Sequence, residues 1–498
     1  MMLPFLVQAN NYKNSTAIYS DGRAFTYQEL INQSEQLANI ILNGGKDLNE
    51  ARVAFMVNPG FDYVQSLWAI WQAGGVAVPL CITHPLPSLA YVLDDTTADI
   101  LMLSAEYLPI LEPYIQEHAI RVIIVESFNA TYTITTLPEI NTSRKALILY
   151  TSGTTNKPKG VVTTHENIEA QITTLVSSWE WSSSDHVICV LPLHHVHGII
   201  NVIGCSMWAG ATCTFISHFS ASSIFELFAE GRINVFMAVP TIYFKLIAFL
   251  ETLPQEKRDQ LKAVMQQFRL MVCGSAALPV SVMEKWEALS GQILLERYGM
   301  TELGMAISNP YTGERRPGYV GLPLPGVSIK LVNETYEEVN LGEPGEIIVK
   351  GKNVFVEYWQ KPEATTETFT KDGWFKTGDI AIVENGYYRI MGRNSVDIIK
   401  SGGYKISALE IEEVLREFDA IDDCAVVGIK DDEWGELIVA AIVVIPEKQG
   451  LFDEKEVSDW IVQKMASYKK PRKYLIVNDL PRNAMGKVVK NDVKKLFE

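Results

Sequence analysis

The chain has 498 residues, a length that allows more than one domain, and its 47% hydrophobic and 20% charged residues are ordinary for a globular protein with a large core. Its formal net charge of −16 argues against a protein that coats nucleic acid or an anionic membrane, so we expect no nucleic-acid partner.

Over much of the first 273 residues, segments with helical periodicity alternate with short apolar runs. Apolar residues at helical spacing predict a helix over 26–41, and a second helix is predicted over 59–74, with Pro59 near its start and Gly74 at its stop. The apolar runs that we interpret as strands are 53–57, 76–80, 100–103, 122–125, 146–150, 161–163, 187–191, 211–216, 235–238 and 270–273. This alternation predicts an α/β fold with doubly wound sheets.

One segment, 198–217, has no charged residue and is about as long as a membrane-spanning helix. It also contains polar residues such as Asn201 and Thr212, and Gly210 divides it into a helix-like part and a strand-like part. We therefore interpret it as a buried helix followed by a core strand, and we predict no membrane span.

From about residue 327 the sequence changes to short strands and turns. Asn385-Gly386 lies between two apolar runs and predicts a tight hairpin. We expect a β-rich subdomain over 327–392 that completes a large domain over 1–392, followed by a small α+β domain over 393–498. The elements predicted in the small domain are helices over 408–417 and 454–465 and strands over 425–429, 438–444 and 474–477.

The cysteines are scattered and form no C-x-x-C pair, which favours reduced thiols over disulfides or a zinc site. They are Cys81, Cys189, Cys205, Cys213, Cys273 and Cys424. The N-terminus has neither a charged n-region nor an Arg-rich amphipathic pattern. We therefore expect a cytoplasmic location.

The stretch from Ala146 to His165 places a loop of small, hydroxylated and cationic residues between two predicted strands. Gly153 and Gly160 permit tight turns and a close approach of the backbone to a ligand. The hydroxyl and ammonium groups come from Ser152, Thr154, Thr155, Lys157 and Lys159. Such a loop suits a polyphosphate, although its spacing is not that of a P-loop, and a polar surface loop is the alternative.

This loop resembles the phosphate-binding signature of the adenylate-forming superfamily, which includes acyl-CoA synthetases, luciferases and the adenylation domains of peptide synthetases. Further motifs follow in the family's order over nearly the whole chain: Tyr298-Gly-Met-Thr-Glu302, Thr377-Gly-Asp379, Gly392-Arg393 and Pro481-x-x-x-x-Gly-Lys487. The resemblance implies a large N-terminal adenylate-forming domain and a small, mobile C-terminal domain.

The same resemblance implies an ATP site. Tyr298 would stack on adenine, Thr301 would hydrogen-bond the α-phosphate, and Glu302 would hold Mg²⁺, which prefers carboxylate oxygens. Asp379 would accept hydrogen bonds from both ribose hydroxyls, and Arg393 would contact the ribose or a phosphate. The other residues implied at ATP are Thr151 (also at the metal), Ser152, Gly153, Thr154, Thr155, Lys159, Gly274, Ser275, Ala276, Gly299 and Met300. Ordinary turns and a surface glutamate are the alternatives for these motifs.

Lys487 matches the family's catalytic lysine, which would bridge the attacking carboxylate and the α-phosphate, so the implied catalytic residues are Lys487, Thr301 and Glu302. A loop implied to meet the acyl-adenylate or the pantetheine arm of CoA contains Lys400, Gly402, Gly403 and Lys405; an ordinary glycine turn is the alternative. The hinge is expected near Ser395. Here the chain departs from the family pattern Gly-Arg-x-x-Asp, because one more residue separates Arg393 from Asp397, and this leaves the hinge residue open.

By resemblance, His195 and His197 line the acyl pocket; a metal is disfavoured because closely spaced histidines at a strand end cannot easily converge on one ion. Arg297 is the most informative residue. A pocket for a monocarboxylate should be apolar, whereas a second carboxylate on the acid would pair with a guanidinium. The surrounding sequence resembles malonate-activating members of the family, which implies malonate or methylmalonate. A structural pair of Arg297 with Glu296 is the alternative.

We therefore predict an ATP-, Mg²⁺- and CoA-dependent acid–thiol ligase that forms an acyl-adenylate and transfers the acyl group to CoA. Two alternatives keep the fold: another short, medium or aryl acid, or loading of a carrier protein. A third is a nucleotide-binding regulator without catalysis, although Glu302, Asp379, Arg393 and Lys487 together argue against it. The assembly is expected to be a monomer or a homodimer.

Overall fold

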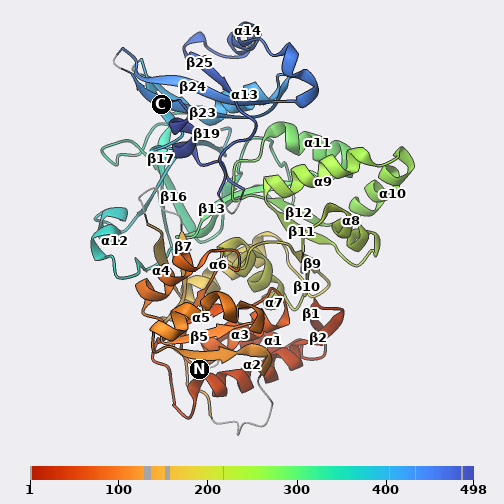
Figure 1. Ribbon diagram of the computed structural model, residues 1–498, viewed down its shortest axis with the longest axis vertical. Helices are drawn as coiled ribbons and strands as arrows, with labels where there is room; N and C mark the ends of the chain where they lie inside the picture. Colours follow the sequence, from red (N-terminus) through yellow and green to blue (C-terminus); the bar gives the residue numbers. More distant parts are fainter. Residues whose placement is uncertain are drawn as a thin grey trace.

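The computed structural model describes residues 3–127, 136–151, 157–216, 218–402, 404–431, 433–483 and 486–497, and for Lys405 and Leu451 it describes the backbone alone. Figure 1 shows the N-terminal strands and helices at one end of the molecule and a separate C-terminal unit at the other end. The segments between them form the middle of the molecule.

Two large sheets build the N-terminal part of the chain. The seven-stranded sheet has the order β18 (Glu357–Tyr358), β8 (Lys159–Thr164), β7 (Lys145–Thr151), β4 (Val76–Pro79), β3 (Arg52–Met56), β5 (Ile100–Leu103) and β6 (Arg121–Ile124). The nine-stranded sheet has the order β15 (Leu322–Pro323), β14 (Gly304–Ser308), β13 (Leu295–Met300), β12 (Leu270–Cys273), β11 (Val235–Ala238), β9 (His186–Cys189), β10 (Thr212–Phe215), β1 (Thr16–Ser20) and β2 (Arg23–Thr26). In both sheets the central strands are parallel and antiparallel pairs lie at an edge, which confirms the predicted α/β class.

Helices pack on these sheets, and the two helices predicted over 26–41 and 59–74 are among them. In the order of the chain they are α1 (Pro4–Asn10), α2 (Tyr27–Leu42), α3 (Phe61–Gln72), α4 (Leu86–Thr96), α5 (Leu108–Glu117), α6 (His165–Ser178), α7 (Cys205–Ala209), α8 (Ala221–Ala229), α9 (Pro240–Thr252), α10 (Gln255–Met265) and α11 (Val280–Ser290). Helix α2 begins one residue later than predicted because Thr26 is its N-cap and forms a capping box with Glu29. Helix α3 ends just before Gly74, which adopts a left-handed conformation.

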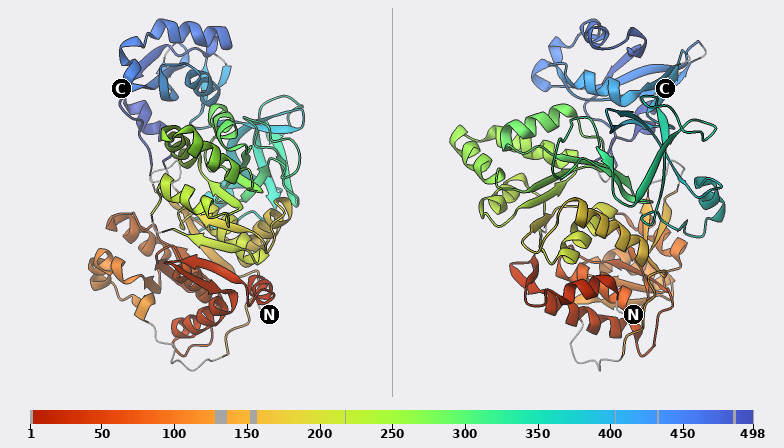
Figure 2. Two further views of the ribbon diagram at one scale, coloured as in Figure 1. Left: turned by 90° about the vertical axis from the view of Figure 1, so that its right-hand side faces the viewer. Right: turned by 180° about the vertical axis from the view of Figure 1, so that it is seen from behind.

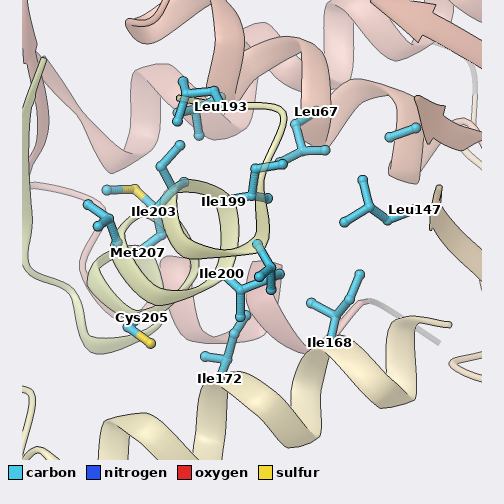
Figure 3. Packing of buried hydrophobic residues seen from close by; sticks show 14 of the residues in the cluster. Leu67, Leu147, Ile168, Ile172, Leu193, Ile199, Ile200, Ile203, Cys205 and Met207 are labelled. Atoms are coloured by element: carbon cyan, nitrogen blue, oxygen red, sulfur yellow. The ribbon is translucent and has the colours of Figure 1, made fainter. Parts of the chain in front are cut away.

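The uncharged segment 198–217 divides as predicted into helix and strand. A π-helix, η3 (His197–Gly204), continues into α7, and Gly210 ends the helical part before β10. Figure 3 shows Ile199, Ile200 and Ile203 of η3 among apolar side chains of neighbouring elements, which include Leu67 and Ile168. In the described ranges, no helix is both long and apolar enough to cross a bilayer.

A four-stranded antiparallel sheet carries the next part of the chain, with the order β16 (Val327–Val332), β17 (Gly345–Gly351), β19 (Phe375–Glu384) and β20 (Tyr387–Arg393). The predicted hairpin joins β19 to β20, and both turn residues, Asn385 and Gly386, have positive φ, as this tight turn requires. Helix α12 (Pro362–Thr368) lies between β18 and β19.

The C-terminal unit has its own sheet and its own apolar clusters. Its strands are β22 (Tyr404–Ser407), β21 (Ile398–Ser401), β24 (Gly435–Val444), β23 (Ile421–Asp431) and β25 (Lys473–Ile476), and its helices are α13 (Ala408–Arg416), α14 (Glu454–Lys464) and α15 (Lys490–Lys495). The predicted elements are confirmed here. The β21–β22 hairpin was not predicted, because its strands are short and its glycines had been assigned to a loop. The domain boundary at residue 392 stays a prediction.

One buried ion pair offers a test of the core of the nine-stranded sheet. The Asp185 carboxylate, which is fully buried, pairs with the Arg269 guanidinium through Nε–Oδ1 and Nη2–Oδ2 contacts of 2.5 and 2.6 Å. We expect Asp185→Asn to lower the free energy of unfolding by about 3 kcal/mol, because it leaves a partly buried cation without its partner. Chemical denaturation would measure this loss. Glu314→Gln, at the exposed pair with Arg316, is the matched control and should leave the transition unchanged.

Candidate active site

The predicted site residues converge where β13, the β19–β20 hairpin and the C-terminal unit meet. Figure 2 shows from two further sides that the C-terminal unit lies next to both α11 and the four-stranded sheet. Val280 N–H, at the start of α11, donates to the Glu413 carboxylate of α13 over 3.4 Å, and Arg389 of β20 pairs with Glu410 of the same helix at 3.0 Å. These contacts fix the orientation of the C-terminal unit over the site.

Tyr298, Asp379 and Arg393 form one hydrogen-bonded group. The Tyr298 hydroxyl donates to Asp379 Oδ2 over 2.6 Å, and Arg393 Nε donates to Asp379 Oδ1 over 3.0 Å. Asp379 is 8% exposed, and its own N–H donates to the Thr377 hydroxyl. Each carboxylate oxygen keeps a second lone pair, so the group can still accept hydrogen bonds from a diol.

Glu302 lies nearby, with 5% of its surface exposed. Its Oε1 accepts a hydrogen bond from the Tyr358 hydroxyl over 2.9 Å, and the Lys159 ammonium lies 4.9 Å from the centre of the Tyr358 ring. Burial raises the pKa of the Glu302 carboxyl. One buried carboxylate beside a lysine fits a magnesium ion that takes its other ligands from phosphate oxygens and water.

Arg297 is buried, with 3% of its surface exposed, and it points along the backbone of Gly274. A Cβ atom at Gly274 would lie 2.7 Å from Arg297 Cζ, so a larger residue there would displace the Arg297 guanidinium. Arg297 Nη2 donates to Ser275 Oγ over 3.2 Å, and the same Oγ lies 3.0 Å from His197 Nδ1. Ser275 adopts a positive φ of 71°, a conformation that few non-glycine residues take up.

The structure shows no ion pair between Arg297 and Glu296, although each side chain influences the pKa of the other. No carboxylate in the described part of the chain lies within ion-pair distance of Arg297, and its Nε has no hydrogen-bond partner there. Burial raises the pKa of Glu296 to about 8, although a hydrogen bond from Leu278 N–H and the charge of Arg297 act in the opposite direction, so that side chain is largely neutral at pH 7. Burial lowers the pKa of Arg297 to about 10, so the guanidinium stays charged. A buried cation therefore faces the site without an anion.

Lys487 reaches the same place from the C-terminal unit. Burial and the neighbouring cations Arg297 and Arg393 lower its pKa to about 8, although Asp379 acts in the opposite direction. His195 and His197 lie close enough that the Lys487 charge also lowers their pKa values. Burial is the larger cause for both, and it brings the pKa of His195 to about 4, so both imidazoles are neutral at pH 7.

Both histidines have a buried ring nitrogen without a hydrogen-bond partner in the described part of the chain. The Nε2 atoms of His195 and His197 are buried and have no hydrogen-bond partner among the described residues. Neutral imidazoles, the Ser275 hydroxyl and the Arg297 guanidinium thus line one face. This donor-rich face differs from the apolar pocket that a monocarboxylate chain would require.

The remaining predicted residues are distributed around this centre or lie outside it. Thr151, the last residue of β7, pairs with Lys159, the first residue of β8. Thr301 lines a small cavity of about 10 Å³ with apolar side chains. Ala276 follows Ser275, and Gly299 and Met300 pair with β14. Ser152, Gly153, Thr154, Thr155 and Gly403 lie outside the described residues.

The predicted CoA loop is part of the C-terminal unit. Among the described residues, the hydrogen bonds of this loop are formed within the same unit. Lys400 N–H donates to Glu436, and Gly402 N–H donates to the Trp434 carbonyl over 2.9 Å. The backbone of Lys405 pairs with Lys400. Ser395 lies in the turn between β20 and β21, where Asp397 accepts a hydrogen bond from Arg393 N–H over 3.0 Å.

Sequence reasoning missed two contacts at the site. Tyr358, the partner of Glu302, belongs to a two-residue strand and carries no motif. Ser275 was implied at ATP by the family resemblance, and its contacts with Arg297 and His197 were not predicted. The signal available in the sequence was Gly274, directly before it, because a glycine at a strand end allows a bulky side chain to pack on the backbone.

Residues 5–359 match the AMP-binding enzyme family, and residues 410–487 match the C-terminal domain of AMP-binding enzymes. The chain is 42% identical to the mitochondrial malonate–CoA ligase ACSF3 of Homo sapiens over 532 residues, which cover 99% of this chain and 92% of that protein. It is 38% identical to the malonate–CoA ligase of Arabidopsis thaliana, over 99% of this chain and 88% of that one.

Solved structures with similar folds include ATP-bound MatB from Rhodopseudomonas palustris. It is 31% identical, has a TM-score of 0.90 and covers 100% of this chain and 99% of its own. Apo MatB from the same organism has a TM-score of 0.81 over the same coverage. The overall arrangement of this chain therefore resembles the ATP-bound form more closely.

The expected cytoplasmic location is wrong in the light of these relatives. ACSF3 is named as mitochondrial in Homo sapiens, Bos taurus and Mus musculus. The six cysteines are free and buried, and this property does not identify the compartment. Cysteine usage was therefore not sufficient to predict a cytoplasmic location.

The order of motifs in the sequence and the arrangement of the two parts of the chain agree with these matches. The family match spans most of the chain, and relatives with known names align over almost all of it. The resemblance to adenylate-forming enzymes is confirmed. This chain belongs to the family of AMP-binding enzymes.

Proposed function

We propose that this protein is an ATP-dependent acid–thiol ligase that converts malonate to malonyl-CoA through a malonyl-adenylate. The observation that carries the proposal is Arg297, a buried guanidinium with no carboxylate partner among the described residues. Relatives named malonate–CoA ligases support the same substrate. The proposed partners are malonate, ATP and CoA.

The second carboxylate of malonate supplies the missing anion. A buried cation without a partner is destabilising, whereas a carboxylate at Arg297 restores a charge-assisted pair. Ser275 and His197 stand beside the guanidinium and can share the second oxygen of that carboxylate. The first carboxylate then points toward Lys487, which adjoins the same pocket.

The adenylation step is an in-line displacement at the α-phosphorus of ATP. One oxygen of the free malonate carboxylate forms a bond to the α-phosphorus while the bond to the bridging oxygen breaks. Pyrophosphate leaves with that oxygen, and the product is a mixed anhydride of malonate and AMP. The Lys487 ammonium, between the carboxylate and the α-phosphate, would stabilise the charge that accumulates there.

Asp379 and Arg393 would hold the ribose, and Tyr298 would border the adenine, so that the α-phosphate faces the acid. Glu302, with Thr151 and the phosphates, would hold Mg²⁺. When bound, the ion supplies charge neutralisation on the phosphate oxygens. Lys159 and the hydroxyls of 152–155 would bind the outer phosphates.

The thioester step needs a different arrangement. We propose that residues 393–498 act as a mobile lid that rotates near Ser395 after pyrophosphate leaves and withdraws Lys487. The β21–β22 hairpin, with Lys400, Gly402, Gly403 and Lys405, would then face the adenylate. The CoA sulfur forms a bond to the carbonyl carbon, AMP leaves with its phosphate oxygen, and the thiol proton passes to solvent.

Arg297→Ala should reduce kcat/KM for malonate in pyrophosphate release about 100-fold, because a buried pair with the substrate carboxylate is lost. Turnover with acetate or propionate, which lack the second carboxylate, should not fall. The measurement is initial pyrophosphate release over a panel of acids with ATP, Mg²⁺ and CoA.

Arg316→Ala, at an exposed arginine paired with Glu314, is the matched control and should leave all acids unaffected. Strong turnover of wild type with monocarboxylates, and no effect of Arg297→Ala on malonate, would remove the malonate assignment while leaving the ligase. No pyrophosphate release with any acid would favour a nucleotide-binding regulator.

The adenylation rate should fall as pH rises through about 8. The depressed pKa of Lys487 means that the ammonium is present below this value and is lost above it. The profile of kcat/KM for ATP without CoA, measured by pyrophosphate release between pH 6 and about 10, reports ionisations of the free enzyme. In Lys487→Arg, whose guanidinium stays charged, the alkaline limb should move to higher pH.

Glu296 ionises in the same pH range, since burial raises its pKa to about 8. Its ionisation would give Arg297 an internal partner and would weaken malonate binding. Glu296→Gln removes this contribution. A limb near pH 8 that persists in Glu296→Gln and disappears in Lys487→Arg assigns it to the lysine, and the reverse pattern would refute that assignment.

A further inference from the structure

The segment that carries Lys487 is a small loop closed by its own backbone. Asn483 N–H donates to the Lys487 carbonyl over 2.9 Å, and the Asn483 side chain accepts from Lys487 N–H over 3.1 Å. Arg482 and Val488 pair as an antiparallel bridge at the base of the loop. The backbone at Lys487 is therefore held in one position relative to Arg482.

The Arg482 side chain joins this loop to the sheet of the C-terminal unit. Its Nη1 donates to the Gly486 carbonyl over 2.8 Å, directly before Lys487, and its Nη2 donates to the Asp423 carboxylate of β23. One guanidinium thus spans the base of the loop and a strand. Lysine has one donor centre and could keep only one of these two contacts at a time.

Asp423 is itself fixed from the other side. Its Oδ1 accepts from Arg416 Nε over 3.2 Å and from Cys424 N–H over 2.8 Å. Arg416 is held in turn by Glu412, 3.6 Å away on the same helix, α13. A continuous series of contacts therefore runs from α13 through β23 to the lysine loop.

The loop also lies beside the large part of the chain. A Cβ atom at Gly486 would lie 3.4 Å from the Thr241 side chain of α9, an ordinary contact distance, and Gly486 has a positive φ of 75°. The lysine loop is therefore bordered by α9 as well as by the sheet of the C-terminal unit.

We propose that Arg482, which is held by Asp423, is a positioning residue. It keeps the Lys487 ammonium at the position that the adenylation step requires. The inference rests on the proposed role of Lys487. Arg482 acts through the lysine and contacts no substrate. It should therefore matter in adenylation, when Lys487 is in the site, and not in the thioester step, when the lysine has withdrawn.

The experiment measures the two half-reactions separately on the full-length protein. Adenylation is followed as single-turnover pyrophosphate release from ATP and malonate. The thioester step is followed as malonyl-CoA formation from chemically prepared malonyl-adenylate and CoA. Arg482→Gln should slow adenylation about 10-fold to 100-fold with little change in KM for ATP, because small misplacements of a charge-stabilising group have effects of this size. The thioester rate should stay within about twofold of wild type.

Two further variants separate positioning from folding. Asp423→Asn removes the carboxylate partner of Arg482 and should likewise slow adenylation without slowing the thioester step. Arg482→Lys should recover part of the adenylation rate that Arg482→Gln loses. Lys464→Gln, which removes an exposed cation of the same unit paired with Glu417, is the control and should change neither step. In a Lys487→Ala background, Arg482→Gln should cause no additional loss.

Equal losses in both half-reactions, or a further loss in the Lys487→Ala background, would overturn the positioning role in favour of a structural one. An adenylation rate unchanged by Arg482→Gln would also overturn it. If Lys487→Ala itself adenylates as fast as wild type, the proposed role of the lysine fails first, and the two failures are thereby distinguished.

Discussion

The burial of positive charge organises this site. Arg297 has lost its water and has gained no anion from the described residues, while Glu296, the acid beside it in sequence, is itself kept largely neutral by burial. Gly274 gives the guanidinium its space, and the neutral imidazoles of His195 and His197 add no competing charge. The fold thus maintains an unfavourable electrostatic state that a dianionic ligand relieves.

The sequence was sufficient for most of the fold. Strands such as 235–238 and 270–273 were predicted with the bounds that the structure has, because buried parallel strands are uninterrupted apolar runs between turn residues. The π-helix η3 looked like an ordinary helix, since its apolar content says nothing of its hydrogen-bond pattern. The β21–β22 hairpin was missed because four-residue strands around glycines give too short an alternation.

The site was predictable where motifs exist and unpredictable where contacts are long-range. Asp379 and Arg393 contact each other because both belong to the β19–β20 hairpin, and the Asn385-Gly386 turn predicts this hairpin from the sequence. The contact of Tyr358 with Glu302, and the neutral state of Glu296, depend on chain segments far apart in sequence. The pKa of a buried group such as Glu296 depends on how completely the fold excludes water from it, and a local sequence pattern does not reveal that exclusion.

The gathering of Arg297, Arg393 and Lys487 also bears on what happens after the first chemical step. In the proposed mechanism, the negative charge of a bound polyphosphate would hold these cations together. Departure of pyrophosphate would remove most of that charge, and the repulsion that, after burial, lowers the pKa of Lys487 would then act on the lysine itself. Loss of the leaving group would thus weaken the attraction that holds residues 393–498 over the site and would favour the rotation that admits CoA.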